Sequence, residues 1–115
     1  MPRFAILMYE DDHAWERLPK ARQDELLRLY GAYVEDLRAR HAFVTGNALG
    51  GPITVLTGSH GGAVSTALST QTAGVLTGWF VVEAADMTAA IGLARGCPAL
   101  LHGEQVHVRP TGHGA

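Results

Sequence analysis

The stretch from Gly78 to Asp86 (GWFVVEAAD) constrains the fold more than any other part of the chain. The large apolar residues that run without interruption from Trp79 to Val82 are typical of a strand buried in a sheet. Asp86 is a good N-cap, and Met87, Ala90, Ile91 and Ala94 after it share one helical face. The sequence therefore predicts a buried strand that passes directly into a helix.

The rest of the chain supplies further strands and a long helix. The apolar run Arg3–Tyr9 (RFAILMY) predicts a strand buried on both faces. Pro19–Arg40 predicts an amphipathic helix, because its apolar residues recur at spacings of three and four. Shorter strands are expected over Ala42–Leu49, Ile53–Thr57, Ala63–Thr66 and Gln105–Pro110, with a loop over Leu68–Leu76 and a short turn over Ala99–His102.

This order of elements predicts the fold class. It is an α+β chain, with a ferredoxin-like βαββαβ plan and an inserted hairpin, forming one domain over residues 1–115. Both helices follow strands, so they should cover one face of an antiparallel sheet. The other face has no cover within the chain, although its strands are apolar, so we expect a homodimer that packs two such faces together.

Composition excludes several classes of function. The net charge of −2 supplies no basic surface for nucleic acid or anionic lipid. Cys97 is the one cysteine, so an intramolecular disulfide and a CxxC motif are both impossible. The sequence has no apolar run long enough for a membrane span and no signal-peptide pattern at its start, so we expect a cytoplasmic protein. Charged residues make up only 17%, below the usual ~25%, which agrees with a partly covered surface.

Two of the six histidines are candidates for acid/base catalysis, and none has zinc-ligand spacing. His107 lies in the middle of the last strand, on the same face as Gln105 and Arg109; the alternative is an exposed or dimer-contact histidine. His13 follows Asp11 and Asp12, whose carboxylates can orient it; the alternative is a solvated loop. His41 is expected to cap the long helix and His102 to lie in a surface loop.

The other candidate residues suit a pocket for a flat ligand. Asn47 lies among small residues and has room to donate a hydrogen bond to an oxyanion; a turn or edge placement is the alternative. The aromatic side chains of Tyr9, Trp15 and Trp79 can wall such a pocket, with plain core as the alternative. Thr66 and Ser69 can supply neutral hydrogen bonds and Arg109 a charged one. Because the chain lacks both GxSxG and GxGxxG, a nucleophilic serine and a nucleotide fingerprint are not expected.

Three segments resemble the YCII-related family, specifically its DGPF-domain branch: LRARHAFVTGNAL, GWFVVEAADMTAAIGLARGCP and QVHVRP. The resemblance implies a dimeric α+β barrel. The motif that gives the branch its name falls here on Thr66-Ala67-Leu68-Ser69, none of which matches. A second YCII branch carries a proposed catalytic His–Asp pair, which aligns here with Gly31 and Ala39. Because neither Gly31 nor Ala39 can exchange a proton, we do not expect this chain to use the acid/base chemistry of that pair.

Two classes of function follow from these observations. The first is a small cofactor-independent enzyme, without a metal, that performs acid/base chemistry on an aromatic or polyketide-like molecule. Its reaction would be of the isomerase, cyclase or lyase type, in a biosynthetic setting, with His107 or His13 as acid/base and Asn47 as oxyanion donor. A cofactor-independent oxygenase on the same barrel is a variant. The second class is a non-catalytic ligand-binding or accessory module.

Overall fold

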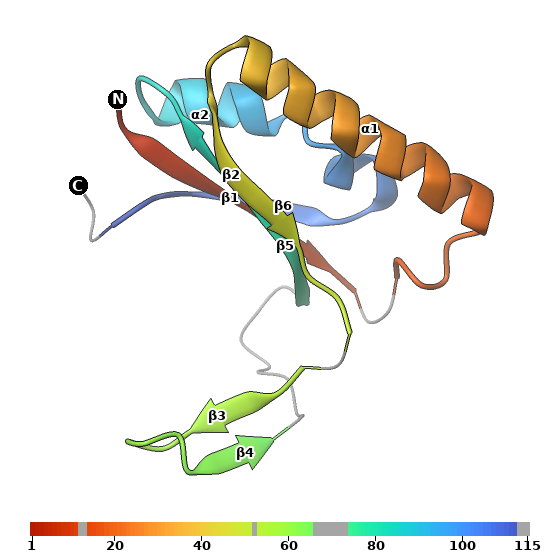
Figure 1. Ribbon diagram of the computed structural model, residues 1–115, viewed down its shortest axis with the longest axis vertical. Coiled ribbons are helices and arrows are strands. Elements are labelled where there is room, and N and C mark those ends of the chain that lie inside the picture. The colour runs from red at the N-terminus through yellow and green to blue at the C-terminus, as the bar shows by residue number, and fades with distance from the viewer. Residues whose placement is uncertain (12–13, 52, 66–73, 113–115) are drawn as a thin grey trace.

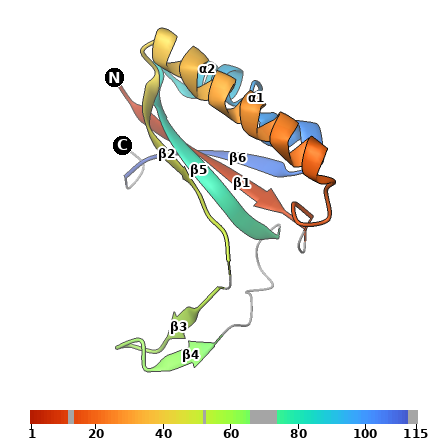
Figure 2. The same ribbon diagram turned by 45° about the vertical axis from the view of Figure 1, so that its right-hand side comes forward.

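The computed structural model describes residues 1–11, 14–51, 53–65 and 74–112 (Figure 1). Its four-stranded antiparallel sheet has the order β2-β5-β1-β6. The strands are β1 (Arg3–Glu10), β2 (Phe43–Ala48), β5 (Val75–Glu83) and β6 (Gln105–Pro110). The helices α1 (Lys20–Ala39) and α2 (Met87–Ala94) lie on one face of this sheet (Figures 1 and 2). This arrangement confirms the predicted ferredoxin-like α+β fold.

The inserted hairpin forms a separate two-stranded sheet. It pairs β3 (Val55–Thr57) with β4 (Ala63–Ser65) and projects away from the main sheet (Figure 1). The expected turn at Ala99–His102 is the 3₁₀ helix η1 (Pro98–His102). The sequence predicts that the loop extends to Leu76. This bound is wrong, because β5 already begins at Val75. No helix in the described part of the chain is long and apolar enough to cross a membrane.

The core lies between the helices and the sheet. Ile6, Leu37 and Val82 are fully buried there. The hydroxyl of Tyr33 donates to the carbonyl oxygen of Leu93 at 2.7 Å, which ties α1 to the end of α2. The Cys97 thiol is buried beside them, and burial raises its pKa to about 11. It therefore behaves as a small apolar residue and not as a nucleophile.

The chain turns sharply at the C-terminus of α1, where His41 has a left-handed backbone conformation with φ of 57°. Its backbone N–H donates to the carbonyl oxygen of Arg38 at 3.0 Å. The predicted cap is therefore made by the backbone of His41, in the manner of helix C-terminal motifs.

The N-cap of α2 provides a direct test of how the fold is anchored. An oxygen of Asp86 accepts a hydrogen bond from the backbone N–H of Ala89 at 2.8 Å. Asp86→Ala should lower the free energy of unfolding by about 1 kcal/mol, because this N–H loses its partner. Urea unfolding followed by circular dichroism measures the loss. The exposed neighbour Thr88→Ala is the control, and equal midpoints for the two variants would contradict the role of the cap.

The face of the sheet opposite the helices has no covering element among the described residues (Figure 2). Strand pairing places Asn47, Trp79, Leu7 and His107 in one row across this face. Leu7 and Trp79 are half-buried in the single chain. The expectation that β1 is buried on both faces is therefore met on one face only, by Phe4, Ile6 and Met8.

Candidate functional site

A large groove runs along α1, with a cavity volume of about 1140 Å³. Leu27, Gly31 and Val34 of α1 form one wall, and Phe43 and Phe80 of the sheet lie opposite. Most of the lining is apolar, and the groove opens beside the edge strand β2. A groove of this kind suits an apolar small molecule better than a polar one.

Polar side chains gather at one end of the groove, where Glu10, Tyr30, Thr77 and Glu104 line it. Glu10 ends β1 and Glu104 precedes β6, and these two strands are neighbours in the sheet. The hydroxyl of Thr77 on β5 donates to Oε1 of Glu104 at 2.7 Å. The sheet therefore brings two carboxyl groups to the same end of an apolar groove.

His102 lies directly behind Glu104, and both side chains are only 3% exposed. Its Nδ1 is 3.4 Å from Oε2 of Glu104, and its Nε2 is 2.8 Å from the hydroxyl of Tyr30. Burial lowers the pKa of His102 and raises that of Tyr30, so both groups are neutral at neutral pH. We assign the imidazole proton to Nδ1, facing the carboxyl, so that Nε2 accepts a hydrogen bond from Tyr30.

The loop after β1 folds back onto this cluster. The backbone N–H of Trp15 donates to Oε2 of Glu10 at 2.9 Å, and Nε2 of Gln23 donates to the Trp15 carbonyl oxygen at 2.8 Å. The indole of Trp15 meets the His102 ring edge-on, with centroids 5.6 Å apart. Trp15 lines the groove, and its predicted role in ligand binding stays a prediction.

Both carboxyl groups hold their protons more tightly than usual. Burial raises the pKa of Glu104 and of Glu10, and the charge of Glu104 raises the pKa of Glu10 further. A carboxyl group with a raised pKa can transfer a proton closer to neutral pH than an exposed one.

These shifts predict how stability depends on pH. The raised pKa of Glu104 favours the folded state below its usual value of 4.5, and this contribution is lost as pH rises through the folded-state pKa. Glu104→Gln cannot ionise, so its stability should increase relative to wild type as pH rises through this window. Urea unfolding between pH 4 and 8 measures the difference. Glu25→Gln, at an exposed ion pair with Arg22, is the control; parallel profiles for Glu104→Gln and wild type would contradict the prediction.

The candidates predicted from the sequence divide between two faces of the sheet. Tyr9, Trp79, His107 and Arg109 lie on the uncovered face, where the rings of Tyr9 and His107 are 4.6 Å apart. Nε2 of His107 lies 3.3 Å from the side-chain oxygen of Gln105. Trp15 lies on the helix side, in the groove. His13, Thr66 and Ser69 lie outside the described residues.

His107 and Asn47 are not brought together in the single chain. They occupy the same row, but β6 and β2 are the two outer strands of the sheet. Three strand spacings separate them, which is about 14 Å. Asn47 also borders the groove beside β2, whereas His107 faces away from it.

The polar end of the groove was missed by the sequence-based interpretation. His102 was expected in a surface loop, which is wrong because its side chain is buried against Tyr30 and Glu104. The sequence pattern does not identify Glu10 or Glu104 as site residues. The signal that identifies them is the pairing of β1 with β6, which brings the end of one strand beside the start of the other.

Comparison with known proteins agrees with the fold. The model of the YCII-related domain matches residues 2–111, which is nearly the whole chain. A search of the curated proteins found no match. The match and the ferredoxin-like topology together show that the chain belongs to the YCII-related domain family.

Proposed function

We propose that the groove is the active site of a small cofactor-independent enzyme that moves protons on an apolar, aromatic or polyketide-like molecule. The reaction is of the isomerase, cyclase or lyase type. One observation carries the proposal: Glu10 and Glu104, both with a raised pKa, lie at one end of a large apolar groove. Such a pair is suited to general acid and general base roles.

Glu104 is the group that exchanges a proton with the substrate. Thr77 and His102 hold its carboxyl in one orientation, and the neutral imidazole adds no positive charge that would lower its proton affinity. Glu10 is the second carboxyl of the pair. Because the charge of Glu104 raises the pKa of Glu10, one of the two can stay protonated while the other is ionised.

The test begins with mass spectrometry of ligands released from the purified protein. The identified ligand is then incubated with the protein in deuterium oxide, and deuterium uptake at carbon is followed by NMR. Glu104→Gln should slow this exchange by about a hundredfold or more. Equal exchange rates in wild type, Glu104→Gln and Glu10→Gln would overturn the proposal.

A non-catalytic ligand-binding module is the second candidate. It is favoured by the fact that both carboxyl groups already hold hydrogen bonds within the protein, from the Trp15 N–H and the Thr77 hydroxyl. A ligand that binds and raises the melting temperature without any deuterium uptake would favour this candidate.

We also propose that the chain forms a homodimer through the uncovered sheet face. Support comes from half-buried Leu7, Trp79 and Val81, which leave apolar surface open there. Leu7→Lys at the centre of this face should convert a dimer to a monomer in sedimentation velocity at micromolar concentration. Leu101→Lys, on η1, is the control because Leu101 is already exposed. A monomeric wild-type protein would contradict the dimer.

The acid/base role of His107 remains a proposal tied to this dimer. His107 and Asn47 lie on the face that the second copy would cover, so a site between two copies is where they would act. His107→Ala in the same deuterium assay separates the two locations. Slower exchange in His107→Ala with wild-type rates in Glu104→Gln would indicate that proton transfer takes place at the dimer interface and not in the groove.

A further inference from the structure

Acidic side chains outnumber basic side chains along the groove, as far as the structure describes its lining. Among the described residues that line the groove, Glu10, Glu16, Glu35 and Glu104 supply four carboxyl groups, against the single guanidinium of Arg38. That guanidinium is already engaged, because Arg38 lies 2.9 Å from an oxygen of Glu35 and stacks over the Phe43 ring at 5.0 Å. Even with Glu35 paired to Arg38 and one carboxyl of Glu10 and Glu104 protonated, the described lining residues carry more negative than positive charge.

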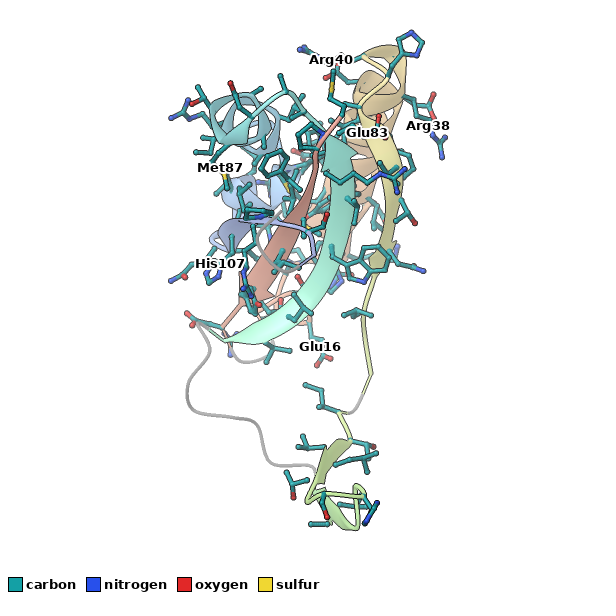
Figure 3. The ribbon with its side chains drawn as sticks, turned by 90° about the vertical axis from the view of Figure 1, so that its left-hand side faces the viewer. Glu16, Arg38, Arg40, Glu83, Met87 and His107 are labelled. Carbon is teal, nitrogen blue, oxygen red and sulfur yellow. The ribbon has the colours of Figure 1, made fainter. Side chains whose placement is uncertain are left out.

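The charges also separate along the groove. Figure 3 shows Arg38 near one end of the sheet and Glu16 near the other. Tyr30 marks the end with Glu10 and Glu104, and the helical rise from Tyr30 to Arg38 is about 12 Å. At physiological salt this distance exceeds the Debye length of about 8 Å, so Arg38 does little to neutralise the acidic end.

Aromatic side chains stand at the same acidic end. Trp15 and Tyr30 both line the groove there, beside Glu10 and Glu104. Carboxylates combined with aromatic rings stabilise an organic cation in place of its hydration shell. An anionic group at the same position would meet like charges and lose its hydration without compensation.

We infer that the groove takes an amphiphilic amine, with the ammonium group between Glu10 and the aromatic rings and the apolar body along α1 toward Phe43 and Phe80. This inference rests on the proposed function for the location of the site, and it specifies the class of substrate. The ammonium group next to Glu10 keeps that carboxyl ionised. Glu104, held by Thr77 and His102, is then the group that exchanges protons with the bound molecule.

Three probes with the same apolar body test the inference: 4-phenylbutylamine, 4-phenylbutanol and 5-phenylpentanoate. Isothermal titration calorimetry on the full chain at pH 7.5 and physiological salt gives their affinities. The amine should bind about tenfold or more tightly than the alcohol, and the carboxylate most weakly. Glu10→Gln should weaken amine binding about tenfold and leave alcohol binding unchanged, because one charge partner is lost. Glu25→Gln is the matched control for total charge.

Three results would overturn the inference: equal or tighter binding of the alcohol or the carboxylate, no effect of Glu10→Gln on amine affinity, or no amine binding at millimolar concentration. These outcomes are independent of the deuterium assay. Glu104-dependent exchange on a neutral or anionic ligand would leave the proposed function standing and reject the amine. Tight amine binding without deuterium exchange would support the amine as the ligand and contradict the proposed acid/base function.

Discussion

Gly31→Leu is expected to weaken ligand binding in the groove about tenfold or more while the protein stays folded. Gly31 lines the groove, and a Cβ atom built there meets no atom within 4 Å, so a leucine side chain extends into open space. Within a helix, leucine is favoured over glycine by roughly 0.5–1 kcal/mol, so thermal stability should rise. Affinity for a groove ligand such as 4-phenylbutylamine should fall by about tenfold or more, which corresponds to 1.4 kcal/mol. Calorimetry and thermal melting measure the two effects.

Gly92→Leu is the matched control for this variant. Gly92 is an exposed helical glycine of α2 with the same open surroundings, but it does not line the groove. It should show a similar gain in stability and wild-type affinity. Unchanged affinity in Gly31→Leu would show that ligands bind elsewhere, for example on the uncovered sheet face.

Gly46→Ala is expected to have the largest effect on stability among these variants. A Cβ atom at Gly46 would lie 2.5 Å from Cδ1 of Phe80 and 2.9 Å from the backbone oxygen of Trp79. The Phe80 ring is packed in the core and the Trp79 backbone belongs to a central strand, so neither can retreat freely. Overpacking of this kind costs about 1–3 kcal/mol. Urea unfolding gives the free energy.

Gly50→Ala is the control for Gly46→Ala. Gly50 lies just beyond the end of β2, and a Cβ atom there meets nothing within 4 Å. Its stability should match wild type within about 0.5 kcal/mol. Because Phe80 also borders the groove, Gly46→Ala should weaken ligand binding in addition to stability. Equal stability of the two variants would contradict the close packing of β2 on β5.

The fold could be predicted because its signals are local. The apolar runs at Arg3–Tyr9 and Trp79–Val82 mark the two central strands, and Asp86 marks the start of α2 by its own side chain. The alternation over Gln105–Pro110 also gave the correct faces, with Val106 and Val108 against the core and His107 on the other side.

The site could not be predicted in the same way, because its signals are not local. Glu10 and Glu104 meet only through the pairing of β1 with β6, and Tyr30 reaches His102 from another element. Periodicity placed His107 on a face but did not tell which face of the sheet carries the groove. That depends on where α1 packs, which follows from tertiary contacts and not from the pattern of a single strand.

The position of β1 between β5 and β6 also governs the order in which the site can be assembled during synthesis. β1 leaves the ribosome before its partners β5 and β6. Its apolar residues therefore stay unpaired until these later strands have been synthesised. Among the described residues that line the groove, Glu104 is the last to emerge, directly before β6. A nascent chain that has released the segments up to α2 but not Glu104 and β6 therefore carries Glu10 without the second carboxyl group. The two carboxyl groups come together only when β6 pairs with β1.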